Sequence, residues 1–160
     1  MSDNKILQST TIIRFPDCDP FNHLNNSRYI DYFINAREDH LMEAYQFSPY
    51  AYAKEKGLSW VVGQNQVAYL RPAMLMEKVV ITSTILKLRE RDILVEMMMW
   101  DKDKTQLKSL LWSVFVHFNF KTGKSEIHSE DLVTYFKPFE NPLEKEVSFE
   151  ERVLQLKNSL

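Results

Sequence analysis

Residues 15–26 read FPDCDPFNHLNN and place two carboxylates, one imidazole and three carboxamides in a single short stretch. A carboxylate held beside backbone amides can attack a polarised acyl carbon, or activate a water molecule against it. A nearby imidazole can move a proton or position a substrate. These residue types at this spacing therefore allow acyl transfer to water, with Asp19 and His23 as the leading candidates.

The same residues also have a purely structural interpretation, because Asp, Asn and Pro populate ordinary turns and helix caps for local reasons. Composition alone favours that interpretation. Pro20 nevertheless biases Asp19 toward extended backbone geometry, which would fix the direction of its carboxylate. Asn22 is among the residues that best tolerate a left-handed conformation. Both interpretations stay open on these grounds.

A helix is predicted directly after the polar stretch, over residues 27–45. Its apolar side chains recur at three- and four-residue spacings, and further ones widen the stripe, so we expect cover on most of its circumference. Asn25, Asn26 or Ser27 can cap it. The first N–H groups of a helix lack intrahelical acceptors and lie at the positive end of its dipole. Amides from Asn25 to Arg28 are therefore candidates to stabilise an oxyanion.

Five strands are predicted, over residues 8–15, 60–70, 77–88, 93–100 and 106–120, with a bulge at Gly63. The last strand alternates an apolar and a more polar face, which predicts half burial. A short helix is predicted over 49–57, and a capping box of Ser148 and Glu151 predicts another over 149–158. This order predicts an α+β fold, with a curved antiparallel sheet of about five strands around one long central helix and an additional C-terminal helix.

Composition narrows the classes of function. With 160 residues and 44% hydrophobic content, the chain suits one domain. A net charge of -2 disfavours nucleic acid as a partner. The start of the chain lacks the pattern of a secretion signal, no apolar run is long enough to span a membrane, and a single cysteine fits a reducing compartment. We therefore expect a cytoplasmic protein without a membrane partner.

The stretch RFPDCDPFNHLNNSRYIDYFINAR (residues 14–37), followed downstream by YLRP (residues 69–72), resembles the hotdog-fold acyl-CoA thioesterases of the hydroxybenzoyl-CoA thioesterase type. The resemblance runs in order over about residues 12–120 and implies a hotdog core at about 6–122, with an extension at 123–160. In that family a sheet wraps one helix, two protomers join their sheets edge to edge, and the active sites lie at the dimer interface. The resemblance thus implies a homodimer or a dimer of dimers.

Roles are carried over from the resemblance by position. Asp19 matches the catalytic carboxylate, as nucleophile or general base, and His23 matches the histidine that takes part in the site of similar acyl-carrier-protein thioesterases. The resemblance implies an acyl-CoA or acyl-carrier-protein thioester as substrate, with coenzyme A as part of the substrate and no separate cofactor. The residues expected to shape the site or contact substrate are Asn25, Asn26, Ser27, Arg28 and Arg71.

Other side chains receive structural roles. We expect Asp17 to be a loop-stabilising hydrogen-bond acceptor, and His117 to be a hydrogen-bonded residue of the sheet. Negative charge on both sides of Cys18 should raise the pKa of its thiol. Spacings typical of metal ligands are missing from the sequence, so no metal site is expected.

The sequence departs from the family pattern at three places. Asn22 stands where glycine is common, Phe21 stands where plant-type relatives have asparagine, and Met76-Glu77 replaces a usual Gly-Asp pair. Two alternatives therefore accompany the hydrolase interpretation. One is a non-catalytic acyl-thioester-binding protein, and the other is a hydratase of enoyl or hydroxyacyl thioesters.

Overall fold

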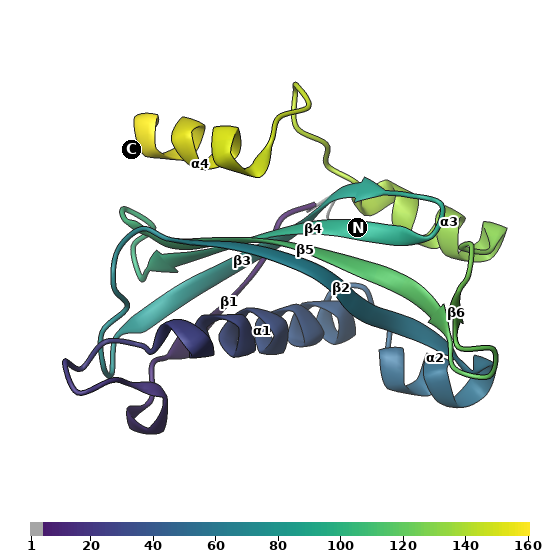
Figure 1. Cartoon of the computed structure of the whole chain (residues 1–160), viewed down its shortest axis with the longest axis horizontal. Coiled ribbons are helices and arrows are strands. Elements are labelled where there is room, and N and C mark those ends of the chain that lie inside the picture. The colour runs from purple at the N-terminus through teal and green to yellow at the C-terminus, as the bar shows by residue number, and fades with distance from the viewer. Residues whose placement is uncertain (1–4) are drawn as a thin grey trace.

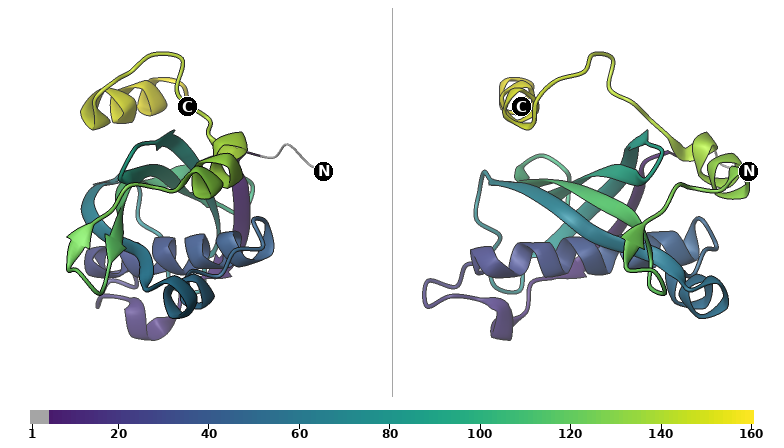
Figure 2. Two further views of the ribbon diagram at one scale, coloured as in Figure 1. Left: turned by 90° about the vertical axis from the view of Figure 1, so that its right-hand side faces the viewer. Right: turned by 45° about the vertical axis from the view of Figure 1, so that its right-hand side comes forward.

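The computed structural model describes residues 5–160, and its central feature is one antiparallel sheet with the strand order β1-β3-β4-β5-β2 (Figure 1). A short sixth strand, β6, pairs with β5. The sheet curls around helix α1, as the end-on view in Figure 2 shows. The strands are β1 (Leu7–Ile12), β2 (Leu58–Tyr69), β3 (Lys78–Leu88), β4 (Asp92–Asp101), β5 (Leu107–Asn119) and β6 (Lys124–Ser125). The predicted curved sheet around one long helix is confirmed.

Strand β2 carries the predicted bulge. Its register against β5 shifts between Val62 and Gln64, on either side of Gly63. A Cβ atom at Gly63 would lie 2.7 Å from Cγ2 of Val116. A side chain at this position would therefore push the two strands apart, and glycine allows the close approach that the bulge requires.

Helix α1 (Tyr29–Glu43) lies across the concave face of the sheet and begins two residues later than predicted, after the 3-10 turn η2 (Asn26–Arg28). Its buried side chains form one stripe, made of Tyr29, Phe33, Ala36, Arg37 and His40. The opposite face carries exposed polar residues, including Asp31, Asn35 and Asp39. The expectation of cover around most of the helix was therefore wrong, because the sheet of this chain covers one side.

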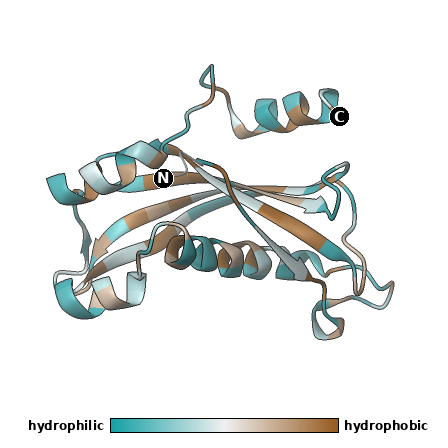
Figure 3. Cartoon of the chain, turned by 180° about the vertical axis from the view of Figure 1, so that it is seen from behind, coloured by the Kyte–Doolittle hydropathy of each residue, from teal (hydrophilic) through white to brown (hydrophobic). Residues whose placement is uncertain are grey.

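Strand β5 is more deeply buried than the half burial that was predicted from its sequence. Its continuously apolar face, which includes Leu110 and Trp112, points away from α1. The more polar alternate face, with Ser113 and His117, is buried on the concave side toward the helix. The strand is thus buried on both faces over most of its length rather than half-buried. Figure 3 shows the hydrophobic residues that run along the central strands.

The C-terminal extension covers the outer face of the sheet. Helix α4 (Phe149–Asn158) matches its predicted range, and the Ser148 hydroxyl caps it by accepting from the Glu151 amide at 3.1 Å. Figures 1 and 2 place α4 and α1 on opposite sides of the sheet. Arg152 of α4 donates two hydrogen bonds of 2.8 Å to Glu96, which also accepts from Trp112 at 2.8 Å. This buried polar contact anchors the extension.

The remaining helices lie near the ends of the sheet. Helix α2 (Pro49–Lys56) was predicted, and Gly57, which has a φ of 69°, caps its C-terminus. Helix α3 (Glu130–Phe136) was not predicted, because its seven residues carry only two buried side chains, Leu132 and Phe136. The other 3-10 turns are η1 (Phe15–Asp17) and η3 (Lys137–Phe139).

Across residues 5–160, no helix has the length and apolarity needed to cross a membrane. Residues 1–4, part of the start considered above, lie outside the described chain.

Candidate active site

The polar stretch forms a loop that joins β1 to α1 and is hydrogen-bonded to the loop between β2 and β3. The Leu24 amide donates to the Ala73 carbonyl, and the Leu75 amide donates to the Asn22 carbonyl, both at 2.8 Å. His23 and Met74 form an isolated antiparallel bridge. The two loops are therefore one backbone-bonded unit, and the position of the first depends on the second.

Asp19 organises the turn in which it lies. Its Oδ1 accepts from the amides of Phe21 and His23, at 2.9 and 3.0 Å, while its own amide donates to the His23 carbonyl at 2.8 Å. The carboxylate thus has a fixed direction. Its second oxygen, Oδ2, has no hydrogen-bond partner among residues 5–160. One oxygen anchors the loop and the other is available to a substrate or a water molecule.

Two departures from the family pattern share one backbone conformation. Asn22 and Met76 both have a φ of 63°, in the left-handed region that glycine occupies without strain. Asn22 adopts it at low cost, whereas the unbranched but longer Met76 pays more. The side chain of Met76 is 60% exposed, so it meets little steric resistance from neighbours. The substitutions therefore leave in place the backbone shape that glycine would favour.

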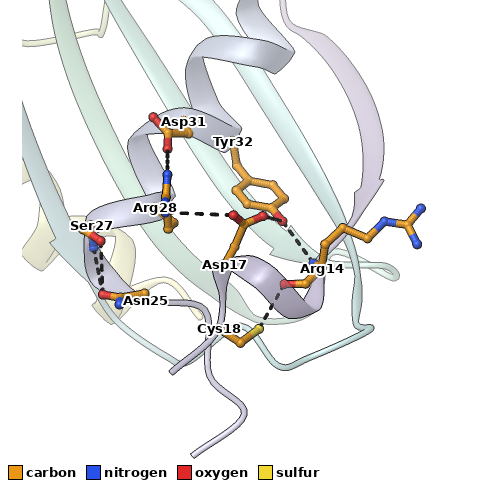
Figure 4. Close-up of polar contacts among 8 residues, drawn as sticks. All are labelled: Arg14, Asp17, Cys18, Asn25, Ser27, Arg28, Asp31 and Tyr32. Carbon is orange, nitrogen blue, oxygen red and sulfur yellow. Dashed lines mark hydrogen bonds and ion pairs between the residues drawn. The ribbon is translucent and has the colours of Figure 1, made fainter. Parts of the chain in front are cut away.

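Asp17 holds the loop to the central helix, as Figure 4 shows. Its Oδ2 accepts from the Tyr32 hydroxyl at 2.6 Å, and the same hydroxyl accepts from the Arg14 amide at 3.0 Å. Burial and the hydrogen bond to Asp17 raise the pKa of Tyr32 to about 12. The prediction of a loop-stabilising acceptor at position 17 is confirmed. The contact between Tyr32 and Asp17 was not predicted from the sequence.

Cys18 lies between the two carboxylates, with its Sγ 3.4 Å from the Arg14 carbonyl oxygen. Burial, followed by the charges of Asp17 and Asp19, raises the pKa of its thiol. The predicted direction is confirmed, although burial rather than charge is the larger cause. A thiol kept protonated in this way is a poor nucleophile.

The amides at the start of the helix are mostly occupied. The Asn25 amide donates to the Asp17 carbonyl at 2.9 Å, the Ser27 amide to Oδ1 of Asn25 at 3.3 Å, and the Arg28 amide to the Asn25 carbonyl at 2.8 Å. Asn25 is therefore the cap. Within residues 25–28, the Asn26 amide is the one for which the described residues offer no acceptor. Of these four amides, it is the one that the described residues leave free to donate a hydrogen bond.

The remaining predicted site residues, His23, Arg28 and Arg71, differ in the contacts that they make with the rest of the chain. The His23 ring centre lies 6.5 Å from that of Phe21, and no described residue hydrogen-bonds to the His23 imidazole. Arg28 pairs with Asp31 at 3.2 Å and lies 3.9 Å from Asp17. Arg71 is exposed on the loop between β2 and β3, where its backbone amide donates to the Lys108 carbonyl at 3.1 Å. The loops thus bring the polar candidates to one end of α1.

Glu77 is a supporting residue whose role sequence reasoning missed. Its Oε1 accepts from the Met74 amide at 2.9 Å, and its Oε2 lies 3.0 Å from the ammonium of Lys108. The ammonium also donates to the Pro72 carbonyl at 3.1 Å. These contacts close the loop that carries Met76 and holds the Asp19 turn. The sequence gives no local signal for this role, because it depends on the burial of Lys108 beside Glu77 in the folded chain.

The buried side chains of His117 and His128 form hydrogen bonds with other residues of the same chain. His117 donates from Nδ1 to the Glu126 carbonyl at 3.1 Å and accepts at Nε2 from the Tyr52 hydroxyl at 3.0 Å. His128 donates to the Arg89 carbonyl at 2.8 Å and accepts from Trp60 at 2.9 Å. The expectation of a hydrogen-bonded sheet histidine at position 117 is confirmed. Across residues 5–160, no cluster of three or more His, Cys, Asp or Glu side chains is arranged to hold a metal ion.

A separate cavity of about 370 Å³ lies between α1, α2 and the sheet. Tyr50 of α2 is part of its lining. Met97 and Met99 of β4 do not line it and are fully buried in the core. None of the residues of the Asp19 loop lines this cavity. The polar loop and the apolar cavity are therefore distinct features.

Comparison with known proteins places the chain among proteins of related sequence and fold. A model of the thioesterase-like superfamily matches residues 13–155. The long-chain acyl-CoA thioesterase FadM of Escherichia coli (strain K12) is 25% identical over 119 residues, which is 74% of this chain and 88% of FadM.

Two solved structures illustrate the shared fold. A probable thioesterase from Escherichia coli superposes with a TM-score of 0.73 at 22% identity, and covers 84% of this chain and 98% of its own. A hypothetical protein from Staphylococcus aureus, solved in complex with CoA, has a TM-score of 0.78 at 14% identity, with 91% of each chain covered. At these identities the two structures establish the fold alone.

Proposed function

Because this chain belongs to the thioesterase-like superfamily, we propose that it hydrolyses the thioester of an acyl-CoA to a carboxylic acid and free coenzyme A. The match to an acyl-CoA thioesterase over most of the chain supports this choice of substrate. One observation carries the chemistry. Asp19 has one carboxylate oxygen anchored by two backbone amides, and its other oxygen has no protein partner among residues 5–160.

In the proposed reaction the free oxygen of Asp19 works on the thioester carbon. As a general base, it takes a proton from water while the water oxygen bonds to the acyl carbon. As a nucleophile, it bonds to that carbon itself and forms an anhydride that water then cleaves. In both routes the Asn26 amide donates to the oxyanion, and the thiolate leaves with a proton for which His23 is the candidate donor.

A panel of acyl-CoA esters tests the proposal through release of free thiol. Asp19→Asn keeps an Oδ1 acceptor for the amides of Phe21 and His23, so the turn should survive while the base is lost. We expect turnover to fall by about 10²–10⁴-fold. Hydrolysis in ¹⁸O-labelled water under single-turnover conditions tests the nucleophilic route, because label enters the Asp19 carboxylate only when that group forms the anhydride and water attacks its aspartyl carbon.

Measurements of folding and of ester binding show whether a loss of thiol release in Asp19→Asn is a loss of catalysis. Thermal unfolding of Asp19→Asn should resemble that of the wild-type chain, and an unfolded variant would remove the support for a catalytic carboxylate. Esters that bind without thiol release would favour a non-catalytic binding protein. Parallel assays with acyl-carrier-protein thioesters decide between the two carriers.

We also propose that two copies pair through β2. This strand ends the sheet order, and Val62 and Gln64 are exposed along it. An unpaired strand edge is a template for pairing with a second chain. Light scattering of the wild-type chain and of an Asn65→Pro variant tests this, since proline at an edge removes a ladder donor. A monomeric wild-type chain would contradict the pairing.

A further inference from the structure

The cavity between α1, α2 and the sheet has the size of a small-molecule site, at about 370 Å³. Its walls are largely apolar and aromatic, with Leu41, Phe47, Ile85 and Phe136 among them. It lies toward the C-terminal half of α1, whereas the Asp19 loop precedes the N-terminus of that helix. Its chemistry can therefore be considered apart from that of the loop.

One buried cation lines this cavity. Arg37 is 5% exposed, and its Nη1 donates to the Ser83 hydroxyl at 2.9 Å. Its Cζ lies 5.1 Å from the ring centre of Tyr45. Among residues 5–160, no carboxylate oxygen lies within 4.0 Å of the guanidinium. A guanidinium has five N–H donors, and Ser83 is the only side-chain acceptor that the described residues offer it.

The other charged residue of the lining does not neutralise Arg37. Glu38 accepts from the Tyr50 hydroxyl at 2.7 Å, and Tyr50 is 63% exposed. This pair marks the solvent side of the cavity, and Glu38 lies beyond ion-pair distance of Arg37. The buried positive charge therefore lacks a counter-charge from the described protein.

A buried charge without a partner is unfavourable, and an anion in contact with it would gain a strong charge-assisted hydrogen bond. The planar guanidinium matches the geometry of a carboxylate, which it can bind through two parallel hydrogen bonds. The surrounding apolar wall favours a hydrocarbon body and penalises a highly polar ligand.

We propose that this cavity binds a hydrocarbon that carries a carboxylate, with the carboxylate paired to Arg37. Two sources have this chemistry. One is a free carboxylic acid, which makes the cavity a site beyond the proposed hydrolysis. The other is the distal carboxylate of a dicarboxylic acyl-CoA, and that source rests on the proposed function.

Binding of decanoate and 1-decanol tests the pairing, because the two probes share a chain and differ in charge. Trp60 lines the cavity, so tryptophan fluorescence can report occupancy alongside calorimetry. We expect decanoate to bind the wild-type chain at least tenfold more tightly than 1-decanol. Arg37→Met should weaken decanoate binding at least tenfold and leave 1-decanol within twofold. Equal wild-type affinities for the two probes would overturn the proposal.

Control variants separate the charge from the fold. Arg37→Lys retains a cation and should recover part of the decanoate affinity. Ala53→Trp fills the cavity from α2 and should abolish binding of both probes. Lys102→Met removes an exposed charge elsewhere and should change neither. If Arg37→Met does not fold, the wild-type comparison of the two probes still decides the matter.

Thiol release then distinguishes the sources. A preference for 9-carboxynonanoyl-CoA over decanoyl-CoA that disappears in Arg37→Met identifies the distal carboxylate. Decanoate binding without such a preference identifies a free acid. Arg37-dependent binding without cleavage of any ester would refute the proposed function and support the cavity site. Thiol release without decanoate binding would support the proposed function and refute the cavity site.

Discussion

The Tyr32 hydroxyl donates a 2.6 Å hydrogen bond to Oδ2 of Asp17 and so ties the central helix to the candidate catalytic loop. The same oxygen accepts from the amide of Arg14, which lies two residues after the end of β1, at 3.0 Å. One phenol thus joins three parts of the chain immediately beside Asp19. Asp17, which this phenol holds, lies two residues before Asp19.

Tyr32→Phe should destabilise the protein and loosen the loop. The change leaves both the Asp17 carboxylate and the Arg14 amide without this partner, so we expect a loss of about 1–3 kcal/mol in the free energy of unfolding. Urea denaturation measures it. Tyr50→Phe is the matched control, because Tyr50 is 63% exposed and bonds only to Glu38 among the described side chains. Equal effects of the two changes would argue against the bracing role.

Met76→Gly should stabilise the protein. Met76 has a φ of 63°, which costs a residue with a Cβ atom about 1–2 kcal/mol and costs glycine little. Its side chain is 60% exposed and contributes little burial. We expect the free energy of unfolding to rise by about 1 kcal/mol. Met74→Gly, at a position without positive φ, should instead lower it. A loss of stability in Met76→Gly would show that its side chain matters more than its backbone.

Stability should fall as the pH drops from 6.5 toward 4. Burial and the charge of Arg37 lower the pKa of His40 from its ordinary 6.5 to about 4. Between these values the unfolded chain binds a proton that the folded chain does not, so stability is full above 6.5 and decreases as the pH falls. The loss from His40 is about 3 kcal/mol.

Equilibrium unfolding across this pH range, with His40→Gln for comparison, checks the linkage. The variant should show a flatter profile in the upper part of the window, above the range in which carboxylates such as Glu140 titrate. Burial also lowers the pKa of His128, so some slope should persist in the single variant. Identical slopes in both proteins would remove His40 as a cause.

Much of the fold was predictable because its signals are local. Alternation and β-branched residues located the five main strands, Gly63 located the bulge, and a serine cap located the final helix. The polar loop was recognisable from residue types within twelve positions. These features depend on neighbours a few residues apart, which a sequence displays directly.

The failures arose where burial depends on a distant partner. The apolar face of β5 was apparent, but only the docking of α4 decided that this face lies outside and the polar face inside. Helix α3 was missed because its two buried residues acquire their meaning from the core that they meet.

The sequence by itself determined which residues could do chemistry, since composition and spacing set what a loop contains. Only the tertiary structure decided how they are held. It anchored one oxygen of Asp19 and left the other free, and it brought Arg37 into a cavity wall without a carboxylate partner among residues 5–160. Hydrogen bonding and charge compensation act across space, between segments whose separation along the chain carries no information about their contact.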